Sequence, residues 1–590
     1  MNRTRRVSLT AALLLWACSD RPTKPHEPST EHHNSSADAQ VEPNQVPGDA
    51  GSAPAHAAEG GTVESSDAAV GGAGAGGSSP PDPSWVNNDA GSSNTPPQCM
   101  PSSGGPHALL EGESVQVAVA CSTGAASRRG FEVARLPDGA EFSADTSTLT
   151  WTPRLDQGGR HEVLVHDPES GETGTVRFDV VDRFDAPDNV PVDPMTYHEE
   201  YGLPVLHLTT GPDLNEDTYA PATIIYRGHS YDGTQAKLRG ATSKTYPKRS
   251  LTLKFTKLDK FNEPSFAGGF LDKRKVVVTT TFDDNAYVRQ RLCYELWNRL
   301  DPSHIKVQAY NAVVFRQGKY YGLYTVSDHI DGYLMEDFGF NQDGDLYKAR
   351  TADVNFRATL NQSDQLKPNL HVGFSKEEGF PVPPEPGAFD TLDGFMQWVI
   401  DMTPEQLAAE ADSRIAVLDY IDWWVFVSFL AADDSVGKNS YHYRDPLVAD
   451  SVWRYVPWDL NHSLGQQWNT TRVSASVTRP EGLYPTMNAL FEKMLKSPLL
   501  PEMRQRYGEV LATGGFQLDE ITALYDAMIA EVDASARRDE LKWAEKYRTF
   551  NSWKSRTDFT TFEQEAVYAR QWLRDRHAYL SARYPAPVTP

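Results

Sequence analysis

The sequence predicts an α+β protein in which a large two-part domain follows a small all-β module and a long unstructured segment. Three observations support this. Residues 19–98 are rich in Gly, Pro, Ser and Ala, and residues 113–182 contain short runs of alternating apolar residues. Residues 190–585 then combine strand-like runs with apolar helical stripes. A chain of 590 residues is long enough for several such units.

Charge and cysteine content exclude several classes of protein. Lys and Arg total 56 against 80 Asp and Glu, a formal charge of −24, which argues against nucleic-acid binding through the overall field. Four cysteines without paired Cys-x-x-Cys spacing exclude a disulfide framework and a zinc finger.

The first eighteen residues have the pattern of an export signal. Arg3, Arg5 and Arg6 precede an apolar run, residues 7–17, which is too short to span a bilayer. The run ends at Cys18 and resembles the lipobox of bacterial lipoproteins. The resemblance implies that Cys18 is lipidated and that the exported protein is anchored to the cell envelope, at the outer membrane or the cell surface. A plain signal peptide with an incidental cysteine is the alternative.

Residues 19–98 cannot bury enough apolar surface to form a core, and we expect a flexible tether.

In residues 99–183, period-two runs such as 114–119, 148–151 and 175–181 predict a small antiparallel sandwich. The stretch from Leu136 to Pro153 resembles the Ig-like (cadherin-like) domains of bacterial surface proteins. Cys99 and Cys121 are close enough to form a disulfide in an oxidising compartment. We expect a spacer or a weak adhesion module.

The pattern in the first half of the large domain predicts a sheet with one helix packed on it. Its features are predicted strands at 205–208, 222–226, 251–255 and 275–280, a helix over 285–300, and a hairpin of 309–315 and 320–327. Leu292, Leu296 and Leu300 form one stripe of the helix, a spacing that fits packing on a sheet. Strands, one helix and then a hairpin is the order of a protein-kinase small lobe.

The second half places acidic and amide residues at the ends of predicted elements. An apolar helix over 415–430 leads to Asp434 and Asn439, and a hairpin of 441–456 leads to Asp459. Transfer of a phosphoryl group from a nucleotide requires a carboxylate near the acceptor hydroxyl and oxygen ligands for a metal ion from two loops. The loop, hairpin and Asp order fits this requirement. No His-Arg precedes Asp434 and no Phe-Gly follows Asp459, which excludes an ordinary eukaryotic-type kinase.

Several linked motifs resemble the CotH (spore coat protein H) kinase-like family, over about residues 195–585. They are Arg239–Ser243 with Tyr246–Ser250, Asp284 with Val288–Leu292, Gly322–Tyr324 with Asp331, Leu346–Lys348, Lys438–Asn439 with Tyr443–Asp445, and Pro457–Leu460. The resemblance implies an atypical protein-kinase-like, two-lobed fold. It also implies phosphorylation of serines in coat proteins with ATP and a divalent metal, Mg²⁺ or Mn²⁺.

Carried over position by position, the resemblance implies a role for three residues. Asp434 would be the catalytic carboxylate, and Asn439 and Asp459 would hold the metal. Four small-lobe residues complete the expected nucleotide site: Arg239 and Lys248 for the phosphates, Lys254 as the alternative cation, and Glu295 as the partner of such a lysine. One departure is Asn461, where the family tends to have a second Asp.

An exported protein meets little ATP, so three functions remain open. The first is a surface-anchored kinase acting on serines of envelope or coat proteins. The second is a binding or adhesion protein of the envelope that keeps the fold with weak or no turnover. The third is a carbohydrate-active enzyme with Asp434 and Asp459 as an acid–base pair, which leaves Asn439 unexplained.

Overall fold

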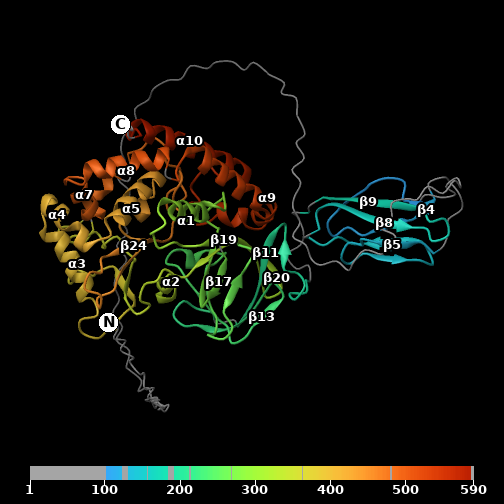
Figure 1. The fold of residues 1–590 in the computed structure, drawn as a ribbon, viewed down its shortest axis with the longest axis horizontal. Coiled ribbons are helices and arrows are strands. Elements are labelled where there is room, and N and C mark those ends of the chain that lie inside the picture. Colours follow the sequence, from blue (N-terminus) through green and yellow to red (C-terminus); the bar gives the residue numbers. More distant parts are fainter. Residues whose placement is uncertain are drawn as a thin grey trace, which may run out of the picture. The chain divides into compact units, whose positions relative to one another are not determined.

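The structure, a computed structural model of the whole chain, describes residues 101–121, 130–155, 157–181, 183, 192–211, 214–266, 269–361, 363–478, 481–513 and 515–586. The expected lipidation site Cys18, the expected tether and Cys99 lie outside these ranges. Helices and strands both contribute to the fold, so the α+β prediction is confirmed (Figure 1).

Residues 101–181 form a β module with two main sheets. One sheet has the order β2 (His107–Leu110), β9 (Thr173–Val181), β8 (Gly159–His166) and β5 (Glu132–Ala134). The other has the order β3 (Val115–Ala118), β7 (Thr148–Trp151) and β6 (Glu141–Ser143), and β1 (Pro101–Ser102) pairs with β4 (Ala120–Cys121). Alternate residues of both main sheets share one core.

The antiparallel prediction for this module fails at one pair of strands. β2, at one edge of its sheet, pairs in parallel with its neighbour β9. Cys121 is disulfide-bonded. Its expected partner Cys99 is outside the described residues, so that pairing stays a prediction.

The first half of the large domain is a nine-stranded sheet. Its order is β10 (Glu199–Glu200), β11 (Leu203–Thr210), β19 (Ala309–Arg316), β20 (Lys319–Asp328), β18 (Lys275–Thr280), β15 (Leu251–Lys254), β14 (Gln235–Leu238), β12 (Ala220–Tyr226) and β13 (His229–Tyr231). β11 also pairs with β12, so the sheet closes on itself. Alternate residues such as Leu206, Ile224 and Val276 fill its interior. A separate hairpin of β16 (Phe261–Glu263) and β17 (Phe270–Lys273) follows β15.

Helix α1 (Arg289–Leu300) packs on the outer face of this sheet, as predicted, with Leu292, Leu296 and Leu300 buried. It begins four residues later than expected because Asp284 holds the preceding turn. The Asp284 carboxylate accepts the backbone N–H groups of Ala286, at 3.0 Å, and Arg289, at 2.9 Å.

The second half of the domain is richer in helices. A four-stranded sheet has the order β22 (Phe374–Glu378), β21 (Asp345–Ala349), β23 (Ser440–Arg444) and β24 (Arg454–Pro457). The helices are α2 (Gly332–Asp337), α3 (Asp390–Asp401), α4 (Pro404–Arg414), α5 (Val417–Leu430), α6 (Tyr484–Met487), α7 (Ala489–Met494) and α8 (Leu500–Ala512).

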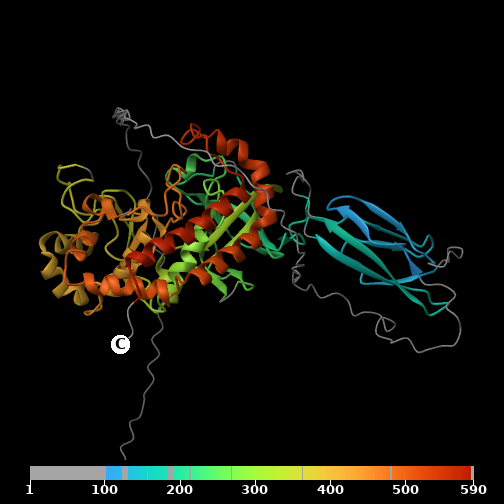
Figure 2. The same cartoon turned by 90° about the horizontal axis from the view of Figure 1, so that it is seen from above.

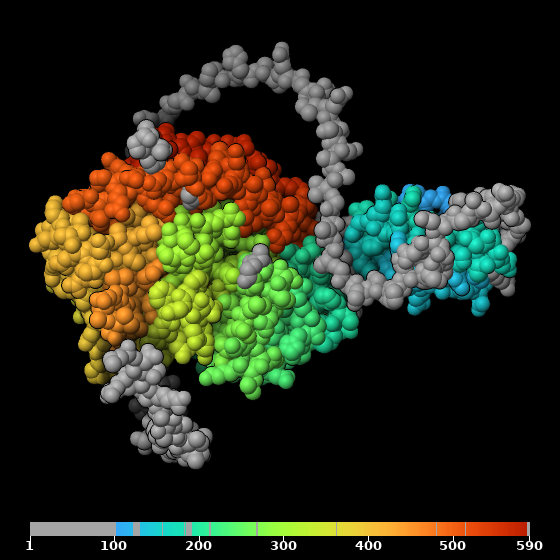
Figure 3. All heavy atoms as spheres, viewed as in Figure 1, coloured from blue at the N-terminus to red at the C-terminus, as the bar shows by residue number. Residues whose placement is uncertain are grey.

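Two long helices complete the chain. α9 (Leu518–Arg548) and α10 (Phe562–Arg583) run side by side (Figures 1 and 2). In Figure 3 their atoms, coloured red, lie against the green atoms of the first half. The Trp543 indole donates to the Tyr321 carbonyl at 3.0 Å, which fixes α9 on β20. None of the described helices combines the length and apolar character that crossing a membrane requires.

Candidate functional site

The loop that carries Asp434 is fixed between a buried helix and a strand. α5 is almost entirely buried and ends where Ala431 adopts a left-handed conformation, with φ 49°. A short turn, Asp433–Ser435, follows. Gly437 permits close packing, because a Cβ atom there would lie 2.5 Å from the Met487 carbonyl oxygen. The loop therefore has little freedom to move its carboxylate.

Asp434 and Asn439 contact each other directly. The Asn439 side-chain amide donates to Asp434 Oδ2 at 2.9 Å, and Lys438 Nζ lies 2.7 Å from Asp434 Oδ1. Burial alone would raise the pKa of Asp434, but hydrogen bonding from His462 and the charge of Lys438 hold that pKa below its usual range. Asp434 is therefore an ionised carboxylate at neutral pH.

Asp459 ends the hairpin of β23 and β24 next to this loop. The backbone N–H of its neighbour Trp458 donates to the Asn439 carbonyl at 3.2 Å. Burial raises the pKa of Asp459, and the nearby carboxylates of Asp434 and Asp283 add to the shift, whereas the charge of His462 opposes it. The structure thus brings together the three residues that the spacing singled out, Asp434, Asn439 and Asp459.

His462 lies among the site residues, although the sequence did not single it out. Its Nε2 lies 3.0 Å from Asp283 Oδ2, and its Nδ1 lies 3.9 Å from Asp434 Oδ2. Burial opposes its charge, but the hydrogen bonds to Asp283 and Asp434 raise the pKa of His462 to about 10. An imidazolium therefore lies among the carboxylates. The sequence offered one signal for His462: it lies three residues after Asp459 and directly follows Asn461, where the family tends to have Asp.

Two cations lie beside Asp459, one predicted and one missed. The Arg239 guanidinium is 4.5 Å from the Trp458 ring centroid, and its Nη1 is buried without a hydrogen-bond partner among the described residues. Lys348 Nζ, from β21, is 5.3 Å from the Tyr441 ring centroid and 5.4 Å from that of Trp458. Burial and the charge of Arg239 lower the pKa of Lys348 to about 8. The sequence signal for Lys348 was the motif Leu346–Lys348, which is part of the family resemblance.

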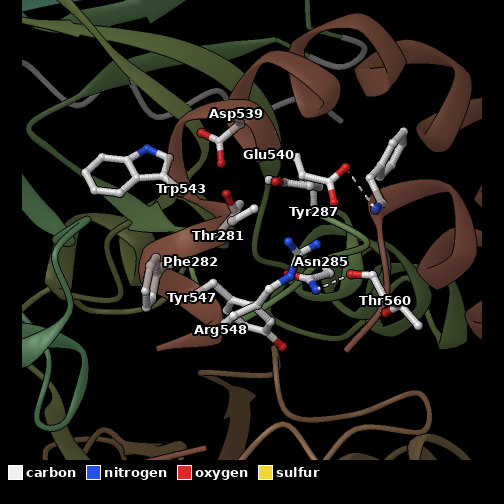
Figure 4. A pocket seen from close by; sticks show the side chains of 12 residues that line it. Thr281, Phe282, Asn285, Tyr287, Asp539, Glu540, Trp543, Tyr547, Arg548 and Thr560 are labelled. Atoms are coloured by element: carbon white, nitrogen blue, oxygen red, sulfur yellow. Dashed lines mark hydrogen bonds between the residues drawn. The ribbon is translucent and has the colours of Figure 1, made fainter. Parts of the chain in front are cut away.

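The phosphate role expected for Lys248 is wrong. Lys248 is fully buried, and its Nζ donates to Asp539 Oδ1 at 2.6 Å and to Thr281 Oγ1 at 2.8 Å. No face of the ammonium group is open to a ligand. Figure 4 shows Asp539 and Thr281 beside a cavity of about 20 Å³, which is too small for a nucleotide.

The pairing expected for Glu295 is also wrong. Glu295 accepts a hydrogen bond from Arg299 one turn along the same helix, at 2.9 Å, and so pairs with no lysine of the sheet. Lys254 Nζ lies 5.2 Å from the Tyr219 ring centroid, at the sheet, where Lys237 contacts the same ring.

Oxygen atoms suited to a hard cation are present near Asp459. In the described part of the chain, no three His, Cys, Asp or Glu side chains are grouped so as to hold a metal ion alone. However, Oδ1 of Asp283 and Oδ1 of Asn461 are buried and lack a hydrogen-bond partner within those same ranges. Carboxylate and amide oxygens are the donors that Mg²⁺ and Mn²⁺ prefer. The donor set therefore fits such an ion if amide oxygens complete it.

A cavity of about 300 Å³ opens beside these groups and is lined in part by Asp434, Lys438 and His462. The arrangement combines an ionised carboxylate facing a cavity, a second set of oxygen donors, and two cations that are not ion-paired within the described residues. Chemically, it can orient a hydroxyl group on one side and hold an anionic group on the other.

Comparisons with known proteins agree with part of this description. A family model described as CotH kinase protein matches residues 236–580. A search of the curated proteins finds no match. Among solved structures, an endo-fucoidan hydrolase, MfFcnA4, from glycoside hydrolase family 107 is similar at 12% identity, with 27% of each chain covered and a TM-score of 0.14. A titin I-band fragment, I67–I69, shows 11% identity over 26% of this chain and 58% of its own, with a TM-score of 0.10.

Proposed function

The chain belongs to the CotH kinase protein family, and from that premise we propose that it is an atypical protein kinase with a two-lobed kinase-like fold. The reaction is transfer of the γ-phosphoryl group of ATP to serine side chains of envelope or coat proteins. One observation carries the proposal: Asp434, Asn439 and Asp459 meet beside the cations Arg239 and Lys348.

Asp434 orients the acceptor. Each carboxylate oxygen has two lone pairs, so the bonds from Lys438 and Asn439 leave acceptor capacity toward the cavity. The serine hydroxyl donates a hydrogen bond to this capacity, which aims its oxygen at the phosphoryl group. Because the pKa of Asp434 is low, it suits a loose transition state in which the hydroxyl proton leaves late.

Phosphoryl transfer from ATP to the serine hydroxyl needs no further reactant. A bond forms between the serine oxygen and the γ-phosphorus, and the bond from that phosphorus to the bridging oxygen breaks. The electron pair of the broken bond stays on ADP. The serine proton passes to Asp434 and then to water, so the products are phosphoserine, ADP and a proton.

Arg239 and Lys348 hold the phosphates. The unpaired Nη1 of Arg239 and the ammonium group of Lys348 are donors beside Asp459. Asp459 and Asn439 would hold Mg²⁺ or Mn²⁺, with the Asn461 oxygen as a further donor. When bound, the metal neutralises charge on the phosphate oxygens.

A second candidate function is binding without turnover, in adhesion or assembly of the cell envelope. The observation in its favour is that both Asp434 oxygens already have partners within the chain, Lys438 and Asn439. For either function we propose that the protein is exported and anchored through lipid on Cys18, which places its acceptors or partners in the envelope.

Thermal-shift titration of the full chain tests the proposal. With ATP and Mg²⁺ or Mn²⁺ we expect a rise in melting temperature and transfer of label from [γ-³²P]ATP to a serine-rich acceptor protein. Asp459→Asn should remove the metal dependence of the shift. No shift at millimolar nucleotide would contradict the kinase and favour the binding function.

A further inference from the structure

The cavity beside Asp434 has two chemically different walls. Asp434, Lys438 and His462 form the polar wall, and Trp468, Leu483 and Met487 form the apolar wall. The described residues that line it include neither Arg239, Lys348 nor Asp459. The cavity therefore reaches the carboxylate separately from the cations to which we assign the phosphates.

The cations of the polar wall are already neutralised. Lys438 pairs with Asp434 at 2.7 Å, and His462 lies between Asp283 and Asp434. A cavity whose cations are paired has no charge to offer a phosphate group. Its composition fits a neutral, partly apolar occupant with a hydroxyl group.

Trp468 is unusually exposed for its size, at 56%, and its loop is held in place. The backbone N–H groups of Gln467 and Thr470 close the loop, with bonds to Thr471 and Gln467 carbonyls at 2.9 and 2.8 Å. Arg556 donates to Thr470 Oγ1 at 2.7 Å. A large aromatic side chain presented by a fixed loop at a cavity is typical of a binding contact.

The part of the apolar wall that Met487 forms is fixed to the Asp434 loop. The Asn488 side-chain amide donates to the Val436 carbonyl at 2.6 Å, and the Met487 carbonyl packs against Gly437. The backbone at Met487 is therefore held close to the loop that carries Asp434. The cavity is preformed, which lowers the cost of ordering the groups that bind.

One further atom points to a polypeptide occupant. Oδ1 of Asn361, another lining residue, is buried and has no hydrogen-bond partner in the described ranges. A buried acceptor without a partner is costly. A backbone N–H from an extended peptide would satisfy it.

From these contacts we infer that the cavity is the acceptor site, and that it selects a serine next to a bulky aromatic or aliphatic residue. The inference rests on the proposed kinase function and names its substrate class. The serine hydroxyl meets Asp434, the neighbouring side chain packs on Trp468, and a peptide N–H donates to Asn361. Because the cations that line the cavity are already paired, an acidic neighbour would find no free cation among the described lining residues and is unfavourable.

The test uses the full chain, ATP, Mg²⁺ and ten-residue peptides that differ only in the residue after serine: Phe, Leu, Ala or Asp. We expect kcat/KM for the Phe and Leu peptides to exceed that for the Asp peptide at least tenfold. Trp468→Ala should raise the KM of the Phe peptide about tenfold, equivalent to about 1.4 kcal/mol, and leave the KM of ATP unchanged. Trp468→Phe should restore most of the preference.

Leu447→Ala is the matched control, because Leu447 is 86% exposed on the hairpin loop between β23 and β24, away from the cavity. Binding of a peptide with Ala in place of Ser, followed by fluorescence anisotropy, gives a readout that needs no turnover. It should weaken about tenfold in Trp468→Ala and remain unchanged in Leu447→Ala.

Two outcomes separate the inference from the proposed function. In the first, the wild-type chain labels peptides while Trp468→Ala leaves both the KM of the Phe peptide and the binding of the Ala peptide unchanged. That result overturns the acceptor-site inference and leaves the proposed kinase function intact. If the wild-type chain labels no peptide and binds no nucleotide, the proposed function and this inference fail together.

Discussion

The Nζ atom of Lys248 lies 2.6 Å from Oδ1 of Asp539, 291 residues further along the chain, and both side chains are almost completely buried. The same Asp539 oxygen accepts the backbone N–H of Leu323 on β20 at 2.7 Å. This ion pair joins the closed sheet to α9, so a residue expected to bind phosphate instead holds the end of the chain in place.

We expect Lys248→Met to destabilise the fold strongly. It leaves the Asp539 carboxylate buried without its counterion, and breaking a buried pair from one side costs about 3–5 kcal/mol. Urea unfolding followed by circular dichroism measures the change. Lys244→Met is the control, since Lys244 and its partner Glu216 are 45% and 41% exposed and such pairs contribute about 0–1 kcal/mol. Equal effects of the two variants would contradict the structural role of Lys248.

We expect Asp434→Asn to abolish phosphoryl transfer and preserve nucleotide binding. The amide keeps the size of the carboxylate but accepts fewer hydrogen bonds, so the acceptor hydroxyl loses its orientation. General acid–base and positioning groups of this kind contribute roughly 10²–10⁴-fold in rate. Label transfer and an ATP thermal shift, measured on the same preparation, separate the two effects. A loss of the shift would mean that Asp434 belongs to the nucleotide site.

We expect the affinity for ATP to fall as the pH rises through about 8. Lys348 has a lowered pKa of about 8, so it is charged below that pH and loses its charge above it. The charged form attracts phosphate, and the affinity is therefore highest below pH 8. Calorimetric titration from pH 6.5 to 9.5 measures the profile.

Two substitutions separate the charge of Lys348 from other titrating groups. Lys348→Met should weaken ATP binding about 10- to 100-fold at pH 7, from the loss of one charge-assisted hydrogen bond, and should flatten the pH profile. Lys348→Arg should keep the affinity at pH 9, because guanidinium stays charged. A wild-type profile that persists in Lys348→Met would assign the pH dependence to another group.

We expect Gly437→Ala to disturb the Asp434 loop. The added Cβ would lie 2.5 Å from the Met487 carbonyl oxygen, a backbone atom that cannot rotate away. Overpacking of this kind costs about 1–3 kcal/mol, and the displaced loop should lower phosphoryl transfer as well.

Gly394→Ala on α3 is the matched control, since its Cβ meets no atom within 4 Å. In a helix that change should stabilise by about 0.5–1 kcal/mol. Thermal melts of both variants give the comparison.

Local patterns predicted the elements around the site. The apolar run of α5, the strand β18 and the hairpin of β19 and β20 follow from periodicity, and the observed bounds differ from the expected ones by at most two residues. The loop after α5 and the end of the hairpin then place Asp434, Asn439 and Asp459 together, because these elements are adjacent in sequence and space.

Long-range pairing could not be predicted in the same way. Closure of the sheet through β11 and β12 and the partner of Lys248 depend on contacts that no local pattern encodes. The Glu295–Arg299 pair, by contrast, follows from i, i+4 spacing within one helix. The local sequence around a lysine near a strand is the same whether the side chain faces a cleft or a buried aspartate. The charge states of Lys348 and His462 depend on burial and on the charged side chains around them, and these become visible only in the fold.

The position of Asp539 has a consequence for how the protein is made. Lys248 and Leu323 emerge from the ribosome long before Asp539, which contacts both of them, so the sheet lacks these two contacts until α9 has been made. Any product that stops short of α9 carries an ammonium group in an apolar interior without its counterion. We therefore expect such fragments to be less stable, and more easily degraded by proteases, than the finished polypeptide.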